Sequence, residues 1–576
     1  MRLPSLATIL VALAWATAVP LASAQPGLQP RHLPKSTVFY VAWHGMPAGE
    51  ARKANSLFAL WDDPDFAPVR AAMLEELLKS SAEQEKTQAP LTKEEMAEVA
   101  SLLDNEFVAG YIGDPNPARA AAAAGESQTS KWNGMFLVYD RTGKEATLAK
   151  LMLRARMSEK DPPKISTETL AGIPVIKMER SGGTSYWAEN GKYALSASEP
   201  AVFEQITAWT KHASAGAAEL SQSAAYKEAS DLLAGGVLEL FFHFPSVKQM
   251  AGDSSAAGFR IRPLLQNVRV DAVHLMAGHL SLEGSRTRIQ GAILGDTAPG
   301  TPFDIWDAGT AAPGSLAYLS PSIVSLQESR INFLGIYELL KRALRSTVPA
   351  SQQSPADFVE GAAKKRLGVT IPEALASFTG EFTSLQSSAA LDPAKRVFVI
   401  GIQKKPETLK LLRAALADRI AAERSEGDTT FLKISEGGMH SSAGTASWKY
   451  YHLAVTGDAI VISSRLDSVR ETLDAKKNGD ALLPPAWQAA RTQFPKMING
   501  LSFVDFQKVD WAAVKERWKA ESLKAAPERV KSGAVPRALE HTMDLLDPQI
   551  FRRHLHQTAS ASWKDAQGMH VDGWID

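Results

Sequence analysis

The chain has 576 residues, of which 45% are hydrophobic and 22% charged, and it contains no cysteine. This length and hydrophobic content suffice for two or more domains with cores of their own. The lack of cysteine excludes disulfides, thiolate nucleophiles, Cys-ligated zinc or iron–sulfur sites and lipids attached through Cys. Basic and acidic residues balance at 63 each, and no basic stripe or large Lys/Arg cluster stands out, which argues against nucleic-acid binding and against membrane binding by charge alone.

Residues 1–24 are typical of a secretory signal peptide. Arg2 supplies a positive charge, residues 6–21 form an apolar stretch, and Ala22-Ser23-Ala24 is a small-residue cleavage motif. Cleavage after Ala24 would remove one charged residue, Arg2, and leave a mature chain with a net charge of −1 that begins at Gln25. We therefore expect a periplasmic or secreted protein, with an uncleaved N-terminal anchor as the alternative. No later run approaches the ~20 apolar residues of a spanning helix, so we expect no transmembrane segment in the mature chain.

Six sequence patterns recur in the same order in the two halves of the chain, which predicts an internal duplication. Each half is expected to open with a turn and a strand, to continue with a strand, a strand–helix unit, a tight hairpin and a helix–strand unit, and to close with two strands. The paired segments are 34–40 with 313–318, 106–108 with 381–383, 135–157 with 397–423, 186–198 with 452–464, 225–242 with 486–506, and the closing strands that begin at His274 and His554.

The stretch from Asp296 to Gly314 is rich in Pro, Gly, Ala and Asp and predicts the seam between the copies. After a short linker at 25–30, we place the first unit at 31–295, a linker at 296–312 and the second unit at 313–576. Long helical segments combined with antiparallel hairpins indicate an α+β fold, with helices packed on one face of each antiparallel sheet. Capping boxes predict helix starts at 92–95 and 370–373.

The chain resembles a family of exported bacterial proteins known as domain of unknown function 3352. The resemblance rests on the signal peptide, the Pro-x-Ser/Thr strand opening, residues 367–373 with Thr379-Gly380-Glu381, and the hairpin that ends in Ile460-Val461-Ile462-Ser463-Ser464. It implies an exported protein, but no activity and no functional residues.

Searches for catalytic motifs identify no nucleophile elbow, zinc-protease helix, phosphate loop or dinucleotide fingerprint. Gly143-Lys144 follows a strand and precedes a helix, but it lacks the other residues of a phosphate loop and is interpreted as a solvated turn. Segments 40–44 and 241–244 are rich in aromatic residues and could line a hydrophobic pocket, although core strands are the favoured interpretation.

Three histidines are the only metal-type candidates. His554 and His556 are expected to alternate onto one face of a strand, and His570 to lie on its partner strand. Surface histidines on a wet sheet face are the favoured interpretation, so no metal and no cofactor is expected.

The leading hypothesis is a non-enzymatic protein that binds a ligand or an envelope partner in a cleft between two similar units. A hydrophobic ligand is one candidate. The alternatives are a hydrolase with a dispersed active site that no short motif reveals, and a purely structural surface protein. Catalytic and ligand-binding residues stay unassigned, as does the oligomeric state.

Overall fold

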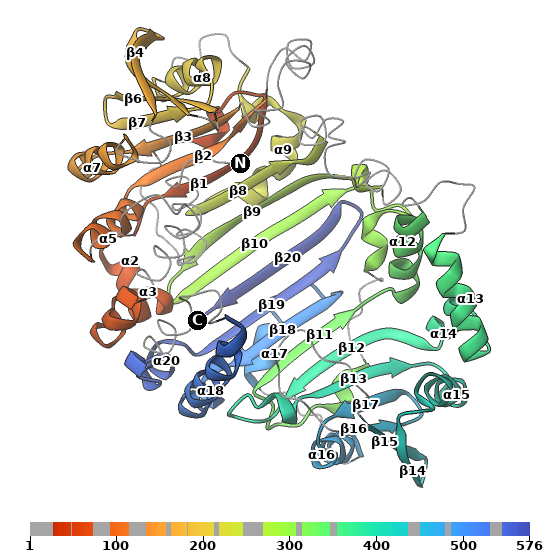
Figure 1. Cartoon of the computed structure of the whole chain (residues 1–576). Helices are drawn as coiled ribbons and strands as arrows, with labels where there is room; N and C mark the ends of the chain where they lie inside the picture. The colour runs from red at the N-terminus through yellow and green to blue at the C-terminus, as the bar shows by residue number, and fades with distance from the viewer. Residues whose placement is uncertain are drawn as a thin grey trace. The chain divides into compact units, whose positions relative to one another are not determined.

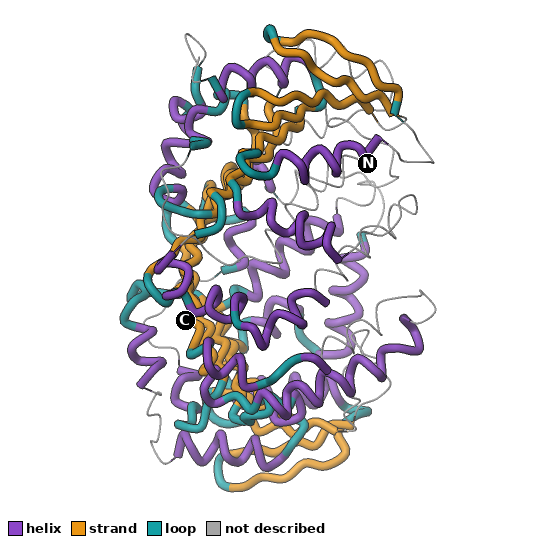
Figure 2. The backbone as a smooth tube through the Cα atoms, turned by 90° about the vertical axis from the view of Figure 1, so that its left-hand side faces the viewer, coloured by secondary structure: helices purple, strands orange, loops and turns teal. Residues whose placement is uncertain are grey.

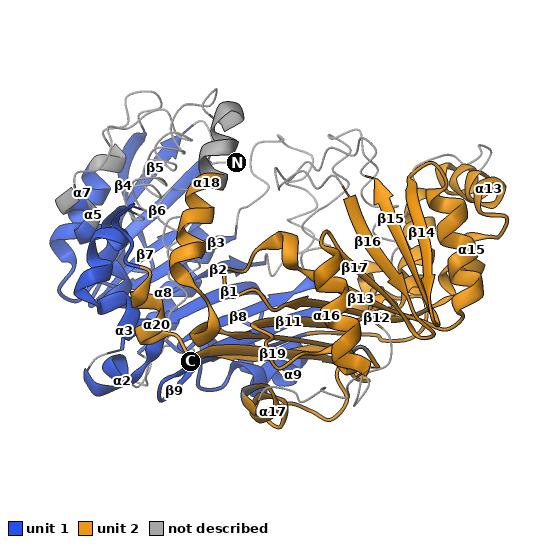
Figure 3. Ribbon diagram, turned by 90° about the horizontal axis from the view of Figure 1, so that it is seen from below, with its two compact units in different colours: residues 1–252, 274–292, 537–547 blue, residues 253–273, 293–536, 548–576 orange. Residues whose placement is uncertain are grey.

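The fold is given by a computed structural model, which describes residues 27–47, 49–72, 93–113, 134–156, 163–180, 183–211, 218–245, 269–306, 314–345, 354–435, 450–477, 485–529 and 544–576. The predicted signal peptide, its cleavage site and Thr92 of the first capping box lie outside these residues. The chain divides into two compact units (Figure 3). Unit 1 comprises residues 1–252, 274–292 and 537–547, and unit 2 comprises 253–273, 293–536 and 548–576. The boundaries at 295 and 313 stay a prediction.

Unit 1 contains an antiparallel sheet in which the strands follow the order β4-β5-β6-β7-β3-β2-β1-β8-β9-β10 (Figure 1). Its hairpin β6–β7 turns at Gly191-Lys192, between the paired residues Asn190 and Tyr193, and Gly191 adopts a φ of +59°. The strands are β1 (Thr37–His44), β2 (Glu106–Ile112), β3 (Met135–Asp140), β4 (Lys164–Leu170), β5 (Ile173–Arg180), β6 (Gly183–Asn190), β7 (Tyr193–Ala197), β8 (Leu238–His243), β9 (Val273–Glu283) and β10 (Arg286–Gly295), the last of which ends in unit 2.

Unit 2 contains an antiparallel sheet with the order β14-β15-β16-β17-β13-β12-β11-β18-β19-β20. The strands are β11 (Ser325–Arg330), β12 (Phe378–Gln386), β13 (Val397–Ile402), β14 (Ile420–Glu426), β15 (Thr429–Ser435), β16 (Tyr450–Val455), β17 (Ala459–Ser463), β18 (Gly500–Asp505), β19 (Gln557–Lys564) and β20 (Gly568–Ile575). The mixed helix and strand composition and the large antiparallel sheet predicted from the sequence are therefore confirmed.

Helices flank the strands in both units. Unit 1 carries α2 (Gly49–Ala54), α3 (Ser56–Asp62), α5 (Lys93–Ala100), α7 (Glu145–Arg156), α8 (Pro200–Thr210) and α9 (Ala224–Leu233). Unit 2 carries α12 (Phe333–Arg345), α13 (Pro355–Leu367), α14 (Ile371–Leu375), α15 (Lys405–Leu416), α16 (Leu466–Lys477), α17 (Pro485–Arg491), α18 (Trp511–Arg529) and α20 (Gln549–His554). The predicted capping box at Thr370 and Glu373 is confirmed at the start of α14.

The expectation that helices cover one face of each sheet is wrong, because they cover both faces. Successive residues of a strand point to opposite faces. In β13, Val397 and Val399 pack with helices α16 and α17, whereas Ile400 and Ile402 pack with α15. In unit 1, β3 likewise packs against α8 on one face and α7 on the other. Figure 2 shows helices on both sides of the strands.

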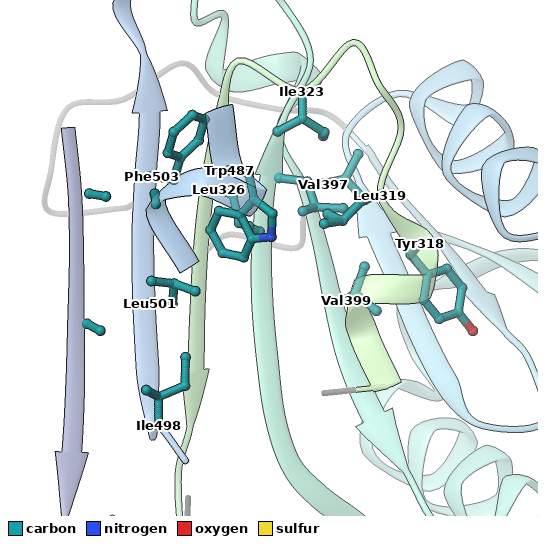
Figure 4. Close-up of a cluster of buried hydrophobic side chains, with 14 of the residues drawn as sticks. Tyr318, Leu319, Ile323, Leu326, Val397, Val399, Trp487, Ile498, Leu501 and Phe503 are labelled. Atoms are coloured by element: carbon teal, nitrogen blue, oxygen red, sulfur yellow. The ribbon is translucent and has the colours of Figure 1, made fainter. Parts of the chain in front are cut away.

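A large core cluster of unit 2 lies on the α16/α17 face (Figure 4). Trp487 of α17 is 1% exposed and packs edge-on against Phe503 of β18, at 5.8 Å between ring centroids. Leu326 and Leu501 belong to the same cluster. These strands are thus buried by aromatic and branched side chains, as their hydrophobic patterns predict.

Three local expectations are wrong. Residues 314–318 form a 3-10 helix, η8 (Gly314–Tyr318), instead of a strand, and β11 begins at Ser325. The helix expected at 406–423 ends at Leu416, because residues 420–426 form β14. His554 ends α20 instead of opening a strand.

Among the described residues, no helix is both long enough and apolar enough to cross a bilayer.

Candidate functional site

A cavity of about 290 Å³ lies in unit 2, between the chain segment that leads into β11, the neighbouring ends of β12 and β13, and one side of α16. Its buried floor is apolar and is formed mainly by Ile323, Leu385 and Val397, with Ala475 of α16 beside them. This volume is near the lower limit of small-molecule sites in proteins. The cavity therefore suits a compact ligand.

The rim of the cavity is polar. Ser320 and Ser322 place their hydroxyl oxygens 2.9 Å apart on one side, and α16 presents the exposed carboxylates of Glu471 and Asp474 on the other. Among the described residues that line the cavity, none is a lysine, arginine or histidine. The lining thus combines an apolar floor with hydroxyl and carboxylate groups, and it carries no positive charge.

One wall of the cavity is Tyr318, whose hydroxyl belongs to a charged network. The Tyr318 hydroxyl donates to Asp458 Oδ1 at 2.8 Å, and Lys476 Nζ donates to the same oxygen at 2.6 Å and to the phenol oxygen at 2.9 Å. The Lys476 ammonium also lies 4.4 Å from the centre of the Tyr318 ring. Such cation–π and charge-assisted contacts hold the ring in one orientation.

The network fixes the charge of each member. Burial raises the pKa of the Tyr318 phenol, and the bond to Asp458 adds to this. Burial alone would raise the pKa of Asp458 and lower that of Lys476, but the hydrogen bonds between them outweigh burial and shift both the other way. At neutral pH the site therefore holds a neutral phenol and an ion pair, and none of these groups is prepared to accept a proton from a substrate.

A second buried polar cluster lies in unit 1. The Tyr40 hydroxyl donates to Glu239 Oε2 at 3.3 Å, and His44 Nε2 lies 3.2 Å from Glu239 Oε1. Tyr40 also interacts with Tyr226 of α9, and burial raises the pKa of Tyr226 to about 12. All these groups lie within the protein, so we interpret the cluster as part of the core.

The aromatic-rich segments divide between the two faces of the unit 1 sheet. Tyr40 and Phe241 are buried and stack at 5.6 Å, which agrees with the core interpretation. Phe39 and Phe242, which point to the opposite face, are partly exposed and stack at 5.9 Å. Gly143 lies in an exposed turn with a φ of +71°, as expected.

The three candidate histidines are not arranged as the sequence analysis expected. His554 is the last residue of α20, and the exposed His556 lies in the two-residue connection that precedes β19. His570 lies on β20, where its ring stacks on Trp563 at 5.4 Å and its Nε2 lies 3.0 Å from Asp565. In the described part of the chain, no three His, Asp or Glu side chains come together as metal ligands would.

Sequence reasoning missed the cavity and both polar clusters. Tyr318, Asp458 and Lys476 come from three separate elements, and 140 residues separate the first two. No short motif could have indicated them. Comparison of the chain with protein-family models, with curated proteins and with solved structures found no match.

Proposed function

We propose that the chain is an exported, non-enzymatic binding protein whose unit 2 cavity holds a small polar ligand that is neutral or positively charged. The observation that carries this proposal is the lining of the cavity. Carboxylates and hydroxyls surround an apolar floor, and the residues that line the cavity include no basic side chain that would pair with an anion. Hydroxyls and carboxylates accept hydrogen bonds from ammonium, hydroxyl or amide donors.

The pKa shifts of the Tyr318 and Asp458 side chains favour binding over catalysis. Enzymes place groups with a pKa near the working pH at the reacting atoms. Here the pKa of Tyr318 is raised and that of Asp458 is lowered, so both shifts move away from neutral pH. A dispersed hydrolase site and a purely structural role are the alternatives, and the cleft expected between the units stays a prediction.

A ligand screen with a cavity-filling variant tests the binding proposal. Putrescine and ethanolamine represent cations, glucose represents neutral polyols, and citrate represents anions. We expect a cation or a polyol to raise the melting temperature and to bind by calorimetry, and Ser322→Trp at the rim to abolish both effects, because the indole would occupy the cavity. Ser425→Trp, on the exposed strand β14, is the control and should bind normally.

Two results of the screen would contradict the proposal. One is a preference for citrate, since the lining offers no cation to pair with it. The other is undiminished binding to Ser322→Trp, which would place the ligand elsewhere. Protein purified from its own host and analysed by native mass spectrometry supplies an independent readout, since a retained ligand adds its mass directly.

We also infer that the two units are copies of one ancestral unit. In support, the ten strands of each unit are arranged in the same order. When ten is added to each strand number of unit 1, the order of unit 2 results, so that β1 corresponds to β11 and β10 to β20. A detail of side-chain bonding agrees: the Leu28 backbone N–H donates to Glu106 Oε2 at 3.0 Å, and the Gly314 N–H donates to Glu381 Oε2 at 3.1 Å. In both cases the donor precedes the first strand of the unit and the glutamate lies on the second.

The duplication inference predicts that an experimental structure of residues 31–295 superposes on one of residues 313–576 over all ten strands. Similar hydrophobic patterns in the same order should settle into similar packing. A different strand order in either half would refute the inference, whatever the outcome of the ligand screen.

A further inference from the structure

Helix α13 of unit 2 has an apolar side that is not covered by the rest of the unit. Phe358 is 71% exposed and Val359 is 49% exposed, and Ala362, one turn further, is also exposed. Figure 1 shows α13 at the periphery, outside α12 and α14. A phenylalanine with so much of its surface in water gains little from folding, so its position calls for another explanation.

The contacts of α13 show which way this side faces. Asp357 accepts from Arg345 at 2.9 Å and Glu360 accepts from Lys341 at 2.7 Å, and both basic residues belong to α12. At about 100° per residue, Phe358, Val359 and Ala362 each lie about 130° or more around the axis from the mean direction of these two acids. The apolar residues therefore point away from α12.

The next turn of the same side is basic. Lys365 and Arg366 follow Ala362, and both are exposed. Arg366 donates to the Ala415 carbonyl at 2.9 Å and lies 3.8 Å from Asp418, a long ion pair, but its side chain is 59% exposed, so its charge stays accessible to solvent. The two acids of the helix are on the opposite side, where α12 neutralises them. The outward side of α13 (Phe358, Val359, Ala362, Lys365 and Arg366) thus presents an apolar turn and a basic turn without a carboxylate of its own.

We propose that the outward side of α13 docks on an anionic lipid bilayer, with Phe358 and Val359 entering the interface and Lys365 and Arg366 pairing with lipid phosphates. An apolar group beside basic residues is the arrangement by which helices bind membrane surfaces. The basic turn supplies the charge complementarity, since anionic headgroups attract lysine and arginine. The run of basic residues at 364–366 is too short to indicate this from the sequence, and its significance depends on Phe358 beside it.

Cosedimentation of the full-length protein with vesicles tests the proposal. We expect binding to mixed phosphatidylcholine–phosphatidylglycerol vesicles, weaker binding to pure phosphatidylcholine, and a decrease as salt is added. Phe358→Ser should lower the partition coefficient about tenfold by removing one inserted ring. Lys365→Glu should weaken binding to the anionic vesicles and leave binding to phosphatidylcholine unchanged.

Leu153→Ser is the matched control, because Leu153 is 57% exposed on a helix of unit 1, α7. It should bind as the unmodified protein does. All three residues are exposed, so the variants should keep their unfolding midpoints, and this check separates lost binding from misfolding. Equal binding to the two vesicle types, full binding by Phe358→Ser, or an equal loss in Leu153→Ser would overturn the proposal, as would the absence of vesicle binding. The test is independent of the ligand cavity, to which α13 contributes no residue.

Discussion

The free energy of unfolding should fall by about 3 kcal/mol as the pH rises from about 4.5 to about 7, because in this range the unfolded chain ionises one carboxyl group whose proton the folded protein still holds. The group is Glu328 on β11, which is 3% exposed between Thr383 and Leu501 of the neighbouring strands. Its Oε2 has no hydrogen-bond partner among the described residues. A carboxylate with an unpaired oxygen in such a place is strongly disfavoured relative to the neutral acid.

The charged groups around Glu328 do not reverse the effect of burial. Burial raises its pKa most, and Glu381 on β12 raises it further, whereas Arg491 of α17 and Arg330 of β11 lower it. The result is a pKa of about 7, against 4.5 for an unperturbed glutamate. Because the folded protein holds this proton more tightly than the unfolded chain, the stabilisation is complete below about pH 4.5 and is lost as the pH passes through 7.

Denaturant titrations of the unmodified protein and of Glu328→Gln at a series of pH values measure this contribution. The amide does not ionise, so the variant should lack this part of the pH dependence and should be more stable than the unmodified protein at pH 8. Glu407→Gln, at an exposed position on α15, should change neither the stability nor its pH dependence. Parallel pH profiles for the unmodified protein and Glu328→Gln would show that Glu328 is not the responsible group.

The sequence sufficed for the parts of the fold that local chemistry determines. The hairpin of β6 and β7 follows from two apolar segments on either side of Gly191, a residue that accepts the positive φ of a tight turn. The start of α14 follows from the Thr370 and Glu373 side chains, which bond the backbone reciprocally. In both places, short-range interactions and the final structure agree.

Other elements depend on distant contacts that the sequence does not reveal. The segment around His554 alternates like a strand, yet the backbone carbonyls of Arg552 and Leu555 accept hydrogen bonds from Gln507, which lies 45 and 48 residues away. These bonds stabilise helix α20 and the residue that follows it. Long-range contacts therefore outweigh the local strand-like pattern. Helices on both sheet faces were missed because an alternating strand does not indicate what covers its polar side.

The candidate site could not be predicted for the same reason. Tyr318 ends the segment 313–318, which resembles a turn followed by a strand, and its partners Asp458 and Lys476 come 140 and 158 residues later. Glu328 lies between Gln327 and Ser329 in β11, a polar sequence that is typical of an exposed strand. Its burial becomes evident only when α17 and the neighbouring strands are placed.

The second large effect is expected in unit 1, where Glu239→Ala should lower the free energy of unfolding by about 3 kcal/mol. Glu239 is 9% exposed and accepts the Tyr40 hydroxyl, and His44 contacts its other oxygen. Alanine would leave both groups buried without this acceptor. The loss in the free energy of unfolding therefore comes mainly from the unsatisfied polar groups and not from the lost side-chain volume.

The chemistry of the cluster allows this explanation to be separated from simple loss of packing. Burial raises the pKa values of Tyr40 and Tyr226, so both phenols stay protonated at neutral pH and continue to require acceptors. Glu239→Gln keeps an amide oxygen at the same place and should cost about 1 kcal/mol, clearly less than alanine. Glu204→Ala, at an exposed position on α8, should stay within about 0.5 kcal/mol of the unmodified protein. Urea unfolding followed by tryptophan fluorescence measures the stability of all three variants. If Glu239→Gln and Glu239→Ala lose the same free energy of unfolding, the cluster requires the carboxylate itself and not merely a hydrogen-bond acceptor.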